Sequence, residues 1–280
     1  MKVENLCLEV TRMCTLECEH CLRGDRRFES MSLETINNIF NGINKINKLV
    51  LTGGEPLLAV KQLKEIVHII KEKSIKIKEI MIITNGTVLS EEILSILEEL
   101  LIISKLNIAV SYDMFHYLEL KRLKLYEERM KNTKILKEKF NAKDYGSLEE
   151  PDDKKSLGRV IYPVGRAATL TEERLNEINK MINTKNYLLM NLRSVYGNLS
   201  EYNEEKNIIK GFINIDVQGN VTGNDLSFVE EDDLVDKYES NINEIGIIKA
   251  VCNHQEYFNE IRKHDIEEHM QKTKKFNESN

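Results

Sequence analysis

Hydrophobic residues follow two alternating spacings over the first part of the chain. Short aliphatic runs, typical of buried strands, alternate with longer stretches in which apolar residues recur every three or four positions, as on one helix face. The runs lie at residues 6–10, 48–52, 80–83 and 106–110. Ser32 and Ser90 stand where helix N-caps belong, and another helix is expected around 63–70. This alternation predicts an α/β fold with a parallel sheet.

The pattern is less regular after residue 113. It predicts, in order, a helix at 115–140 with Leu123, Tyr126, Met130 and Leu136 facing inward, a polar loop at 141–158, a strand at 159–162, a helix at 171–183 and a strand at 213–217. Residues 187–191 fit a strand and a helix end equally well. Gln218, Gly219 and Asn220 turn the last strand toward Val221, which predicts a hairpin.

Glycine-rich and polar segments directly follow the first four expected strands. They are a cysteine loop, residues 53–56, residues 84–86 and residues 111–113. In parallel barrels the residues just after each strand gather at one rim and build the active site. We therefore expect these four segments to converge.

Three cysteines, Cys14, Cys18 and Cys21, lie within eight residues of the first of these loops. Three thiolates leave one iron of a four-iron cluster open to a small molecule, whereas an electron-transfer cluster is usually held by four cysteines. Structural zinc is the main alternative, but it favours four ligands. His20, the available fourth ligand, lies between two cysteines and would have to turn back on its own loop. The spacing therefore predicts a reactive iron–sulfur cluster.

The C-x3-C-x2-C spacing, with the aromatic ring of His20 before the last cysteine, resembles the signature of the radical S-adenosylmethionine (radical SAM) enzymes. The resemblance covers about residues 5–220 and is strongest up to Asp113. It implies a partial (β/α)6 TIM-like barrel, one [4Fe-4S] cluster and S-adenosylmethionine as the second cofactor. It also implies reductive cleavage of that cofactor to a 5′-deoxyadenosyl radical, which removes a substrate hydrogen.

Gly53, Gly54, Glu55 and Pro56 resemble the family segment that holds the methionine ammonium of the cofactor. Two glycines let backbone carbonyls approach a ligand without an intervening Cβ, and Glu55 supplies the anion that a buried ammonium needs. The alternative is a plain turn before a helix, with Pro56 near its first position.

Five further residues receive cofactor roles from the resemblance. Ser111 and Asp113 resemble the ribose-contacting positions, although either could instead cap the next helix. Asn85 is expected to touch the cofactor, and His20 to lie beside the adenine. Arg166, within a Gly-Arg-Ala segment found in family members that modify peptides and proteins, could meet the cofactor carboxylate or an anionic substrate. A surface salt bridge is the alternative for Arg166.

The remaining cysteines and histidines are expected to be ordinary. Cys7 lies within the first strand as a small packed residue, and His68 and His116 lie in helices, the latter close to the rim. Relatives with a C-terminal domain carry several cysteines there for auxiliary clusters, whereas this chain has only Cys252. We therefore expect a radical SAM core at residues 1–222 and a C-terminal extension without metals at 223–280, acidic from residue 230 and then weakly helical.

Composition limits the partners. The formal net charge of −6 argues against general nucleic-acid binding, and no apolar run reaches the roughly 18 residues of a membrane span. An odd number of cysteines, five, and the lack of an N-terminal apolar run favour a reducing, cytoplasmic location over disulfides. The expected partners are a peptide or protein substrate and an external one-electron reductant of flavodoxin or ferredoxin type. A small-molecule substrate, such as a nucleotide or sugar, and a non-enzymatic iron–sulfur sensor are the alternatives.

Overall fold

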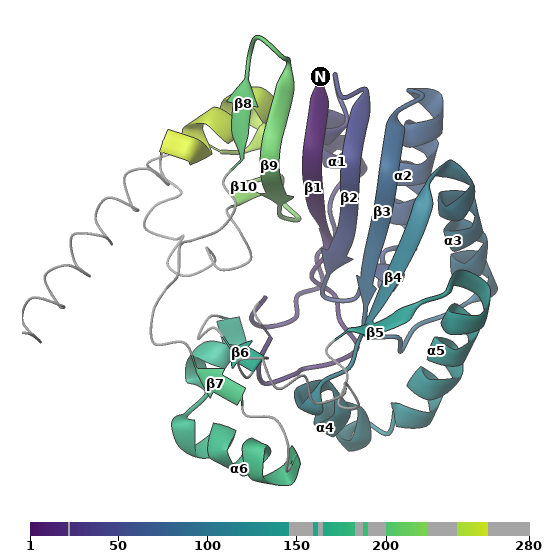
Figure 1. The fold of residues 1–280 in the computed structure, drawn as a ribbon, viewed down its shortest axis with the longest axis vertical. Coiled ribbons are helices and arrows are strands. Elements are labelled where there is room, and N and C mark those ends of the chain that lie inside the picture. Colours follow the sequence, from purple (N-terminus) through teal and green to yellow (C-terminus); the bar gives the residue numbers. More distant parts are fainter. Residues whose placement is uncertain are drawn as a thin grey trace, which may run out of the picture.

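A computed structural model describes residues 1–21, 23–145, 159–161, 165–182, 187–189, 200–222 and 240–256. The predicted α/β class is confirmed: the main sheet has the order β10-β9-β1-β2-β3-β4-β5, and β8 pairs with β9 (Figure 1). Its strands are β1 (Lys2–Thr11), β2 (Lys45–Gly53), β3 (Lys76–Thr84), β4 (Lys105–Ser111), β5 (Lys143–Tyr145), β8 (Glu201–Asn203), β9 (Ile208–Ile215) and β10 (Val221–Thr222). Strands β9 and β1 to β5 run parallel.

Helices cover one face of this sheet (Figure 1). They are α1 (Leu33–Ile39), α2 (Val60–Glu72), α3 (Glu91–Ile103) and α5 (Tyr126–Phe140), while α4 (Met114–Arg122) lies near the carboxyl ends of the strands. Ser32 and Ser90 are the N-caps of α1 and α3, as predicted, and accept hydrogen bonds from the backbone N–H groups of Thr35 and Ile93. Helices α1 and α3 therefore begin where their capping residues predict.

The two faces of the sheet differ in polarity. Leu8 and Leu51, which are register partners in β1 and β2, are fully buried in the core under the helices. Each such leucine contributes about 1.5–3 kcal/mol to stability by leaving water. The next pair along the strands, Glu9 and Thr52, points to the opposite face because successive side chains alternate. That face therefore carries polar groups toward the carboxyl ends of the strands.

The strand expected at 159–162 forms but does not join the main sheet. β6 (Arg159–Ile161) pairs with β7 (Tyr187–Leu189) in a separate two-stranded sheet. The 3-10 helix η2 (Gly165–Thr169) and the helix α6 (Glu172–Ile182) lie between them in sequence. The sixth parallel strand of the main sheet is instead β9, beside β1. The predicted hairpin is confirmed by the antiparallel pairing of β9 with β10.

The single helix predicted over 115–140 is wrong, because α4 and α5 are separate helices. Lys124 between them has a φ of 59°, a left-handed conformation that a continuous helix excludes. After this break Leu136 is buried as predicted, but Met130 is 42% exposed, and Arg129 and Thr133 are buried instead. The expected loop at 141–158 also contains β5; residues 146–158 lie outside the described part.

The described part of the predicted C-terminal extension packs against the core. It contains α7 (Ile242–Ile245) and a helical stretch at 247–256. Ile242, Ile247 and Val251 belong to the same apolar cluster as the main sheet. The boundary at residue 222 stays a prediction, and the acidic run at 230–233 lies outside the described residues. Among the described helices, none is long and apolar enough to cross a membrane.

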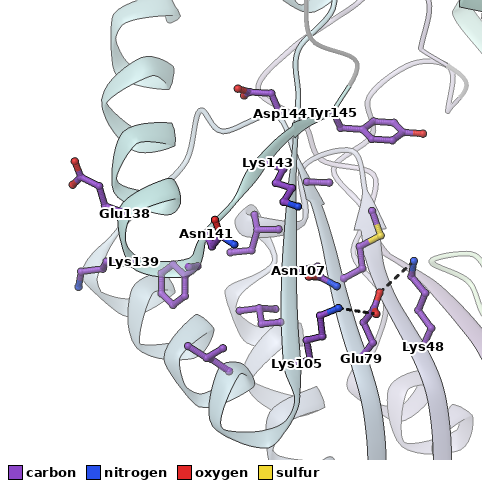
Figure 2. A pocket seen from close by; sticks show the side chains of 16 residues that line it. Lys48, Glu79, Lys105, Asn107, Glu138, Lys139, Asn141, Lys143, Asp144 and Tyr145 are labelled. Atoms are coloured by element: carbon purple, nitrogen blue, oxygen red, sulfur yellow. Dashed lines mark ion pairs between the residues drawn. The ribbon is translucent and has the colours of Figure 1, made fainter. Parts of the chain in front are cut away.

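A hollow of about 790 Å³ lies beside the amino-terminal half of β4 (Figure 2). β5 pairs with β4 only from Ala109 to Ser111, so the earlier part of this edge borders the hollow. On its wall Glu79 lies between Lys48 and Lys105, at 3.5 and 3.7 Å. This end of the strands therefore carries an exposed cluster of charges.

Candidate iron–sulfur and cofactor site

The cysteine loop follows β1 and lies at the carboxyl ends of the parallel strands. Cys18 is buried, and Cys14 and Cys21 are half-buried. The Cys21 N–H donates to the Cys18 carbonyl at 3.1 Å, which folds the second half of the loop into a tight turn. All three thiols therefore belong to one short, structured segment.

Residues 53–55 attach this loop to the end of β2. The backbone N–H of Gly54 donates to the Thr11 carbonyl and that of Glu55 to the Met13 carbonyl, each at 2.7 Å. A Cβ on Gly53 would lie 2.2 Å from the Thr11 oxygen, and one on Gly54 would lie 2.3 Å from the Met13 oxygen. Both positions require glycine because two backbone segments meet there. The absence of a Cβ at these two positions lets the cysteine loop approach β2. From the sequence we expected it to let a ligand approach instead.

The carboxylate of Glu55 joins the ends of β2 and β3. Its Oε1 accepts hydrogen bonds from the Leu57 N–H at 3.0 Å and the Thr84 hydroxyl at 2.8 Å, and its Oε2 accepts from the Asn85 N–H at 2.7 Å. The side chain is fully buried, and burial raises its pKa to about 7 despite these donors. Glu55 also caps the 3-10 helix η1 (Pro56–Leu58), so Pro56 begins a helix, as the alternative interpretation proposed. Ammonium binding by this segment stays a prediction.

Asn85 contacts Cys14, the first cysteine of the loop. It is 5% exposed, and its Nδ2 lies 3.1 Å from Thr15 Oγ1 and 3.6 Å from Cys14 Sγ. Its predicted contact with the cofactor is untested, but the structure brings it against a predicted ligand of the cluster.

His20, Asp113 and His116 form a compact cluster beside the cysteine loop. Asp113 Oδ2 lies 3.0 Å from His20 Nε2, and its Oδ1 lies 2.9 Å from His116 Nδ1. Burial alone would raise the pKa of Asp113, but the two imidazoles hold it well below its ordinary value. The ligand atoms of the three residues lie within 4.8 Å of one another, close enough for one metal ion to reach all three. Asp113 is therefore a carboxylate of lowered pKa that contacts both rings and accepts a hydrogen bond from that of His20.

The contacts of Asp113 bear on the ribose prediction. Its Oδ1 accepts the backbone N–H of His116 at 3.0 Å, so Asp113 is the N-cap of α4, the alternative considered from the sequence. A carboxylate has about four acceptor sites, and the hydrogen bonds from His20 Nε2 and the His116 N–H leave acceptor capacity on Asp113. Ser111 is half-buried at the end of β4. Ribose binding by Ser111 and Asp113 stays a prediction.

Arg166 lies against the cysteine loop. Its Nε donates to the Cys18 carbonyl and its backbone N–H to the Cys21 carbonyl, each at 3.0 Å. Asp25 is 3.8 Å from its guanidinium, which matches the predicted alternative of a salt bridge. Arg166 therefore connects η2 to the turn between two cysteines, and its predicted carboxylate contact is untested.

Sequence reasoning missed two features of this region. His116 was expected to be ordinary, yet it completes the cluster with Asp113; the spacing of Asp and His three residues apart at a helix start was the available signal. Glu9, 2% exposed, lies 3.7 Å from Arg12 and 3.6 Å from Arg23, and burial raises its pKa. A lone acidic residue in an apolar strand run was the signal for Glu9.

The donor set fits an iron–sulfur cluster. Burial raises the pKa of Cys14 to about 11 and that of Cys18 well above its ordinary value, so both carry protons when no metal is bound. Iron must displace those protons, which couples cluster assembly to thiol ionisation. The Leu16 N–H donates to Cys14 Sγ at 3.4 Å, an interaction that favours a charged sulfur. Three thiols with backbone and amide donors suit a cluster better than a four-ligand zinc site.

The radical SAM superfamily model matches residues 8–146, about half of the chain. This segment contains the end of β1, the cysteine loop, strands β2 to β5 and the His20–Asp113 contact. The chain belongs to the radical SAM superfamily. Membership confirms the family resemblance and the expected cofactors, an iron–sulfur cluster and S-adenosylmethionine.

Two curated relatives share parts of the chain. A probable GTP 3′,8-cyclase of Methanococcus aeolicus is 32% identical over 96 residues, 32% of each chain. A 7-carboxy-7-deazaguanine synthase of Methanocaldococcus jannaschii is 35% identical over 78 residues, 21% of this chain and 32% of the relative. This chain therefore spans about a third of the length of the curated relatives it matches.

Solved structures share the fold over a longer stretch. The structure of native anSMEcpe with bound AdoMet has a TM-score of 0.50 at 14% identity, and covers 91% of this chain and 82% of that chain. A second anSMEcpe structure, with AdoMet and a Cp18Cys peptide, has a TM-score of 0.51 at the same identity and coverage. These likenesses confirm the fold.

Proposed function

We propose that this protein is a radical SAM enzyme that cleaves S-adenosylmethionine reductively at a single [4Fe-4S] cluster and removes a hydrogen atom from a peptide or protein side chain. The observation that carries the proposal is the position of Cys14, Cys18 and Cys21 on the loop after β1, attached to β2 through Gly54 and Glu55. The bound cofactors supply the radical chemistry, with one electron from an external donor of flavodoxin or ferredoxin type.

The protein's own residues hold and orient the cofactor in this proposal. Glu55 balances the ammonium group, and its carboxylate keeps one of about four acceptor sites after three protein donors. His20, stacked on Phe115 at 4.5 Å, offers a flat surface for the adenine. Ser111 and Asp113 face the ribose, and Arg166 holds the turn between two cysteines.

Apolar side chains around the cysteine loop help to exclude water, which a radical reaction requires. Leu16 and Cys18 share an apolar cluster with Met114, Phe115 and Ala167, all buried. This cluster joins the loop to α4 and η2. We propose that it protects the reacting groups on the side away from the sheet.

A peptide or protein substrate is supported by the Gly165–Arg166–Ala167 segment, which contacts the cysteine loop, and by the β9–β10 hairpin. One solved structure of this fold contains both AdoMet and a peptide, so the fold accommodates a peptide in that protein. A small-molecule substrate is the second candidate, because both curated relatives are named for nucleotide or deazaguanine chemistry.

The first test measures iron and cofactor cleavage. Anaerobically reconstituted protein should hold about four irons per chain and release 5′-deoxyadenosine when dithionite and S-adenosylmethionine are added. Cys14→Ala, Cys18→Ala and Cys21→Ala should each lose the cluster, while Cys7→Ala, which removes a buried thiol within β1, should keep it. Full iron content in any loop variant, or an intact cluster without cleavage, would contradict the proposal.

A second test separates the two substrate classes. Deuterated candidate peptides, beginning with any short precursor encoded beside this gene, and deuterated nucleotides are incubated with the reduced protein. Transfer of deuterium into 5′-deoxyadenosine identifies the class that donates the hydrogen. Transfer from a nucleotide alone would replace the peptide proposal with the small-molecule one.

A further inference from the structure

The buried side chain of Asn85 has one amide hydrogen directed at Cys14. Its Oδ1 accepts the backbone N–H of Thr87 at 2.9 Å and the Thr87 hydroxyl at 2.6 Å. A backbone N–H can only donate, so the atom facing it must be the amide oxygen. The orientation of the Asn85 amide is therefore set by its partners, and Nδ2 must face the cysteine loop.

The two hydrogens of Nδ2 can be assigned in the same way. The single hydroxyl hydrogen of Thr87 goes to Asn85 Oδ1, so in the 2.6 Å contact between the hydroxyls of Thr15 and Thr87 the donor is Thr15. Thr15 Oγ1 is then free to accept one Nδ2 hydrogen at 3.1 Å. The other hydrogen faces Cys14 Sγ at 3.6 Å, within the range of an N–H···S bond.

The backbone of Asn85 is held as firmly as its side chain. Its N–H donates to Glu55 Oε2 at 2.7 Å, and the next residue, Gly86, has a φ of 77° that lets the chain turn away at once. A Cβ on Gly86 would lie 3.0 Å from Thr133 Oγ1 and from Val110 Cγ1. The donor is therefore preorganised by three strand ends and does not depend on a bound ligand.

We propose that Asn85 is a positioning residue that donates a hydrogen bond to the Cys14 thiolate and raises the reduction potential of the cluster. Hydrogen bonds to cluster sulfurs are one of the means by which a protein sets this potential. The added electron increases the negative charge on the sulfurs, so a donor stabilises the reduced state more than the oxidised state. The inference rests on the proposed function at one point, that Cys14 is a cluster ligand.

The test measures the midpoint potential of the reconstituted cluster, without substrate or S-adenosylmethionine. Asn85→Leu, of similar size and without a donor, should lower the one-electron reduction equilibrium constant by up to about tenfold, which is 59 mV. Asn85→Asp should lower the potential further, because it places a charge where the N–H was. Thr87→Val is the matched control, since it breaks the same hydrogen-bonded ring but keeps the backbone N–H that orients Asn85.

Potentials unchanged in both Asn85 variants, or lowered equally in Thr87→Val, would overturn the inference. If the variants hold no iron, the inference is tested on the unmutated protein labelled with ¹⁵N-asparagine. Pulsed EPR of its reduced cluster should then show a coupled ¹⁵N nucleus and an exchangeable proton. Absence of that coupling also overturns the inference. Iron content and cofactor cleavage of the unmutated protein are measured separately, so a failure of the proposed function is distinguishable from a failure of this inference.

Discussion

The pKa of a glutamate is shifted in opposite directions toward the two ends of the parallel strands. At the carboxyl ends Glu55 is fully buried among three hydrogen-bond donors, and burial raises its pKa to about 7. In the amino-terminal half of β3 the Glu79 side chain is 26% exposed; burial opposes its ionisation, but Asn107, Lys48 and Lys105 lower its pKa. Each carboxylate has several polar partners, so the number of partners does not decide the outcome. The depth of burial and the charge of the partners decide it: Glu55 is fully buried among mainly neutral donors, whereas Glu79 stays partly exposed beside two lysines.

The largest expected effect comes from a single added methyl group at the cysteine end. Gly54→Ala places a Cβ 2.3 Å from the Met13 carbonyl oxygen, so the cysteine loop must move away from β2. We expect a loss on the order of 4 kcal/mol in the free energy of unfolding and little or no bound iron. Denaturant titration measures the free energy of unfolding, and iron analysis measures the bound iron.

Gly42→Ala is the matched change at the opposite end, just before β2. Gly42 has a φ of 75°, and an added Cβ would meet no atom within 4 Å. It should cost about 1 kcal/mol, from the left-handed backbone alone, and leave iron content unchanged. Equal losses in the two variants would mean that the contact between Gly54 and Met13 does not hold the loop.

The next effect is a pH dependence that comes from Glu55. Its folded-state pKa, about 7, is above the ordinary value of 4.5, so between these values the folded state keeps a proton that the unfolded state has lost. The contribution of Glu55 to stability is therefore fully present below pH 4.5 and is lost as the pH rises toward 7, by on the order of 3 kcal/mol. Urea titrations of the iron-free protein from pH 4.5 to 7.5 should give a steeper decline than those of Glu55→Gln. Parallel declines would show that other groups, such as Glu9, cause the dependence.

The smallest effect is expected at the hollow beside β4. Glu79→Gln removes the carboxylate that lies between Lys48 and Lys105, but exposed ion pairs contribute less than about 1 kcal/mol. We expect a change below that value, which shrinks further in 0.5 M salt. Thermal unfolding at low and high salt measures it, and a large effect independent of salt would contradict the contrast between the two ends.

Strand–helix alternation and residues adjacent to strand ends were predictable from the sequence because each depends on local periodicity. Cysteine spacing and the Gly-Gly-Glu-Pro segment identified the family for the same reason. The break at Lys124 was not predictable, since no glycine or proline marks it and a lysine takes the left-handed conformation. The position of β9 beside β1 depends on pairing between residues some 200 apart in the chain, which a local pattern does not encode.

At the site, the sequence indicated which residues gather but not what each one contacts. Glu55 and Arg166 were expected to face a ligand. The described partners of Glu55 are the Thr84 hydroxyl and the backbone N–H groups of Leu57 and Asn85, and Arg166 donates to the backbone of the cysteine loop. Their side chains are long enough to reach several groups, and only packing decides among them. Asn85 and Cys14 are 71 residues apart, so their contact follows from the meeting of two strand ends.

The attachment of the cysteine loop to β2 and β3 has a consequence for the order of assembly during synthesis. The three thiols, the Gly54 and Glu55 hydrogen bonds, and the ring formed by Thr15, Asn85 and Thr87 all lie within residues 11–87. Synthesis proceeds from the N-terminus, so the segment that carries the predicted iron ligands and these contacts is complete before α4 and η2 have been made. We expect the cysteine loop to stay accessible to iron until the later elements pack on it, because Arg166 can contact the loop only after η2 has been made.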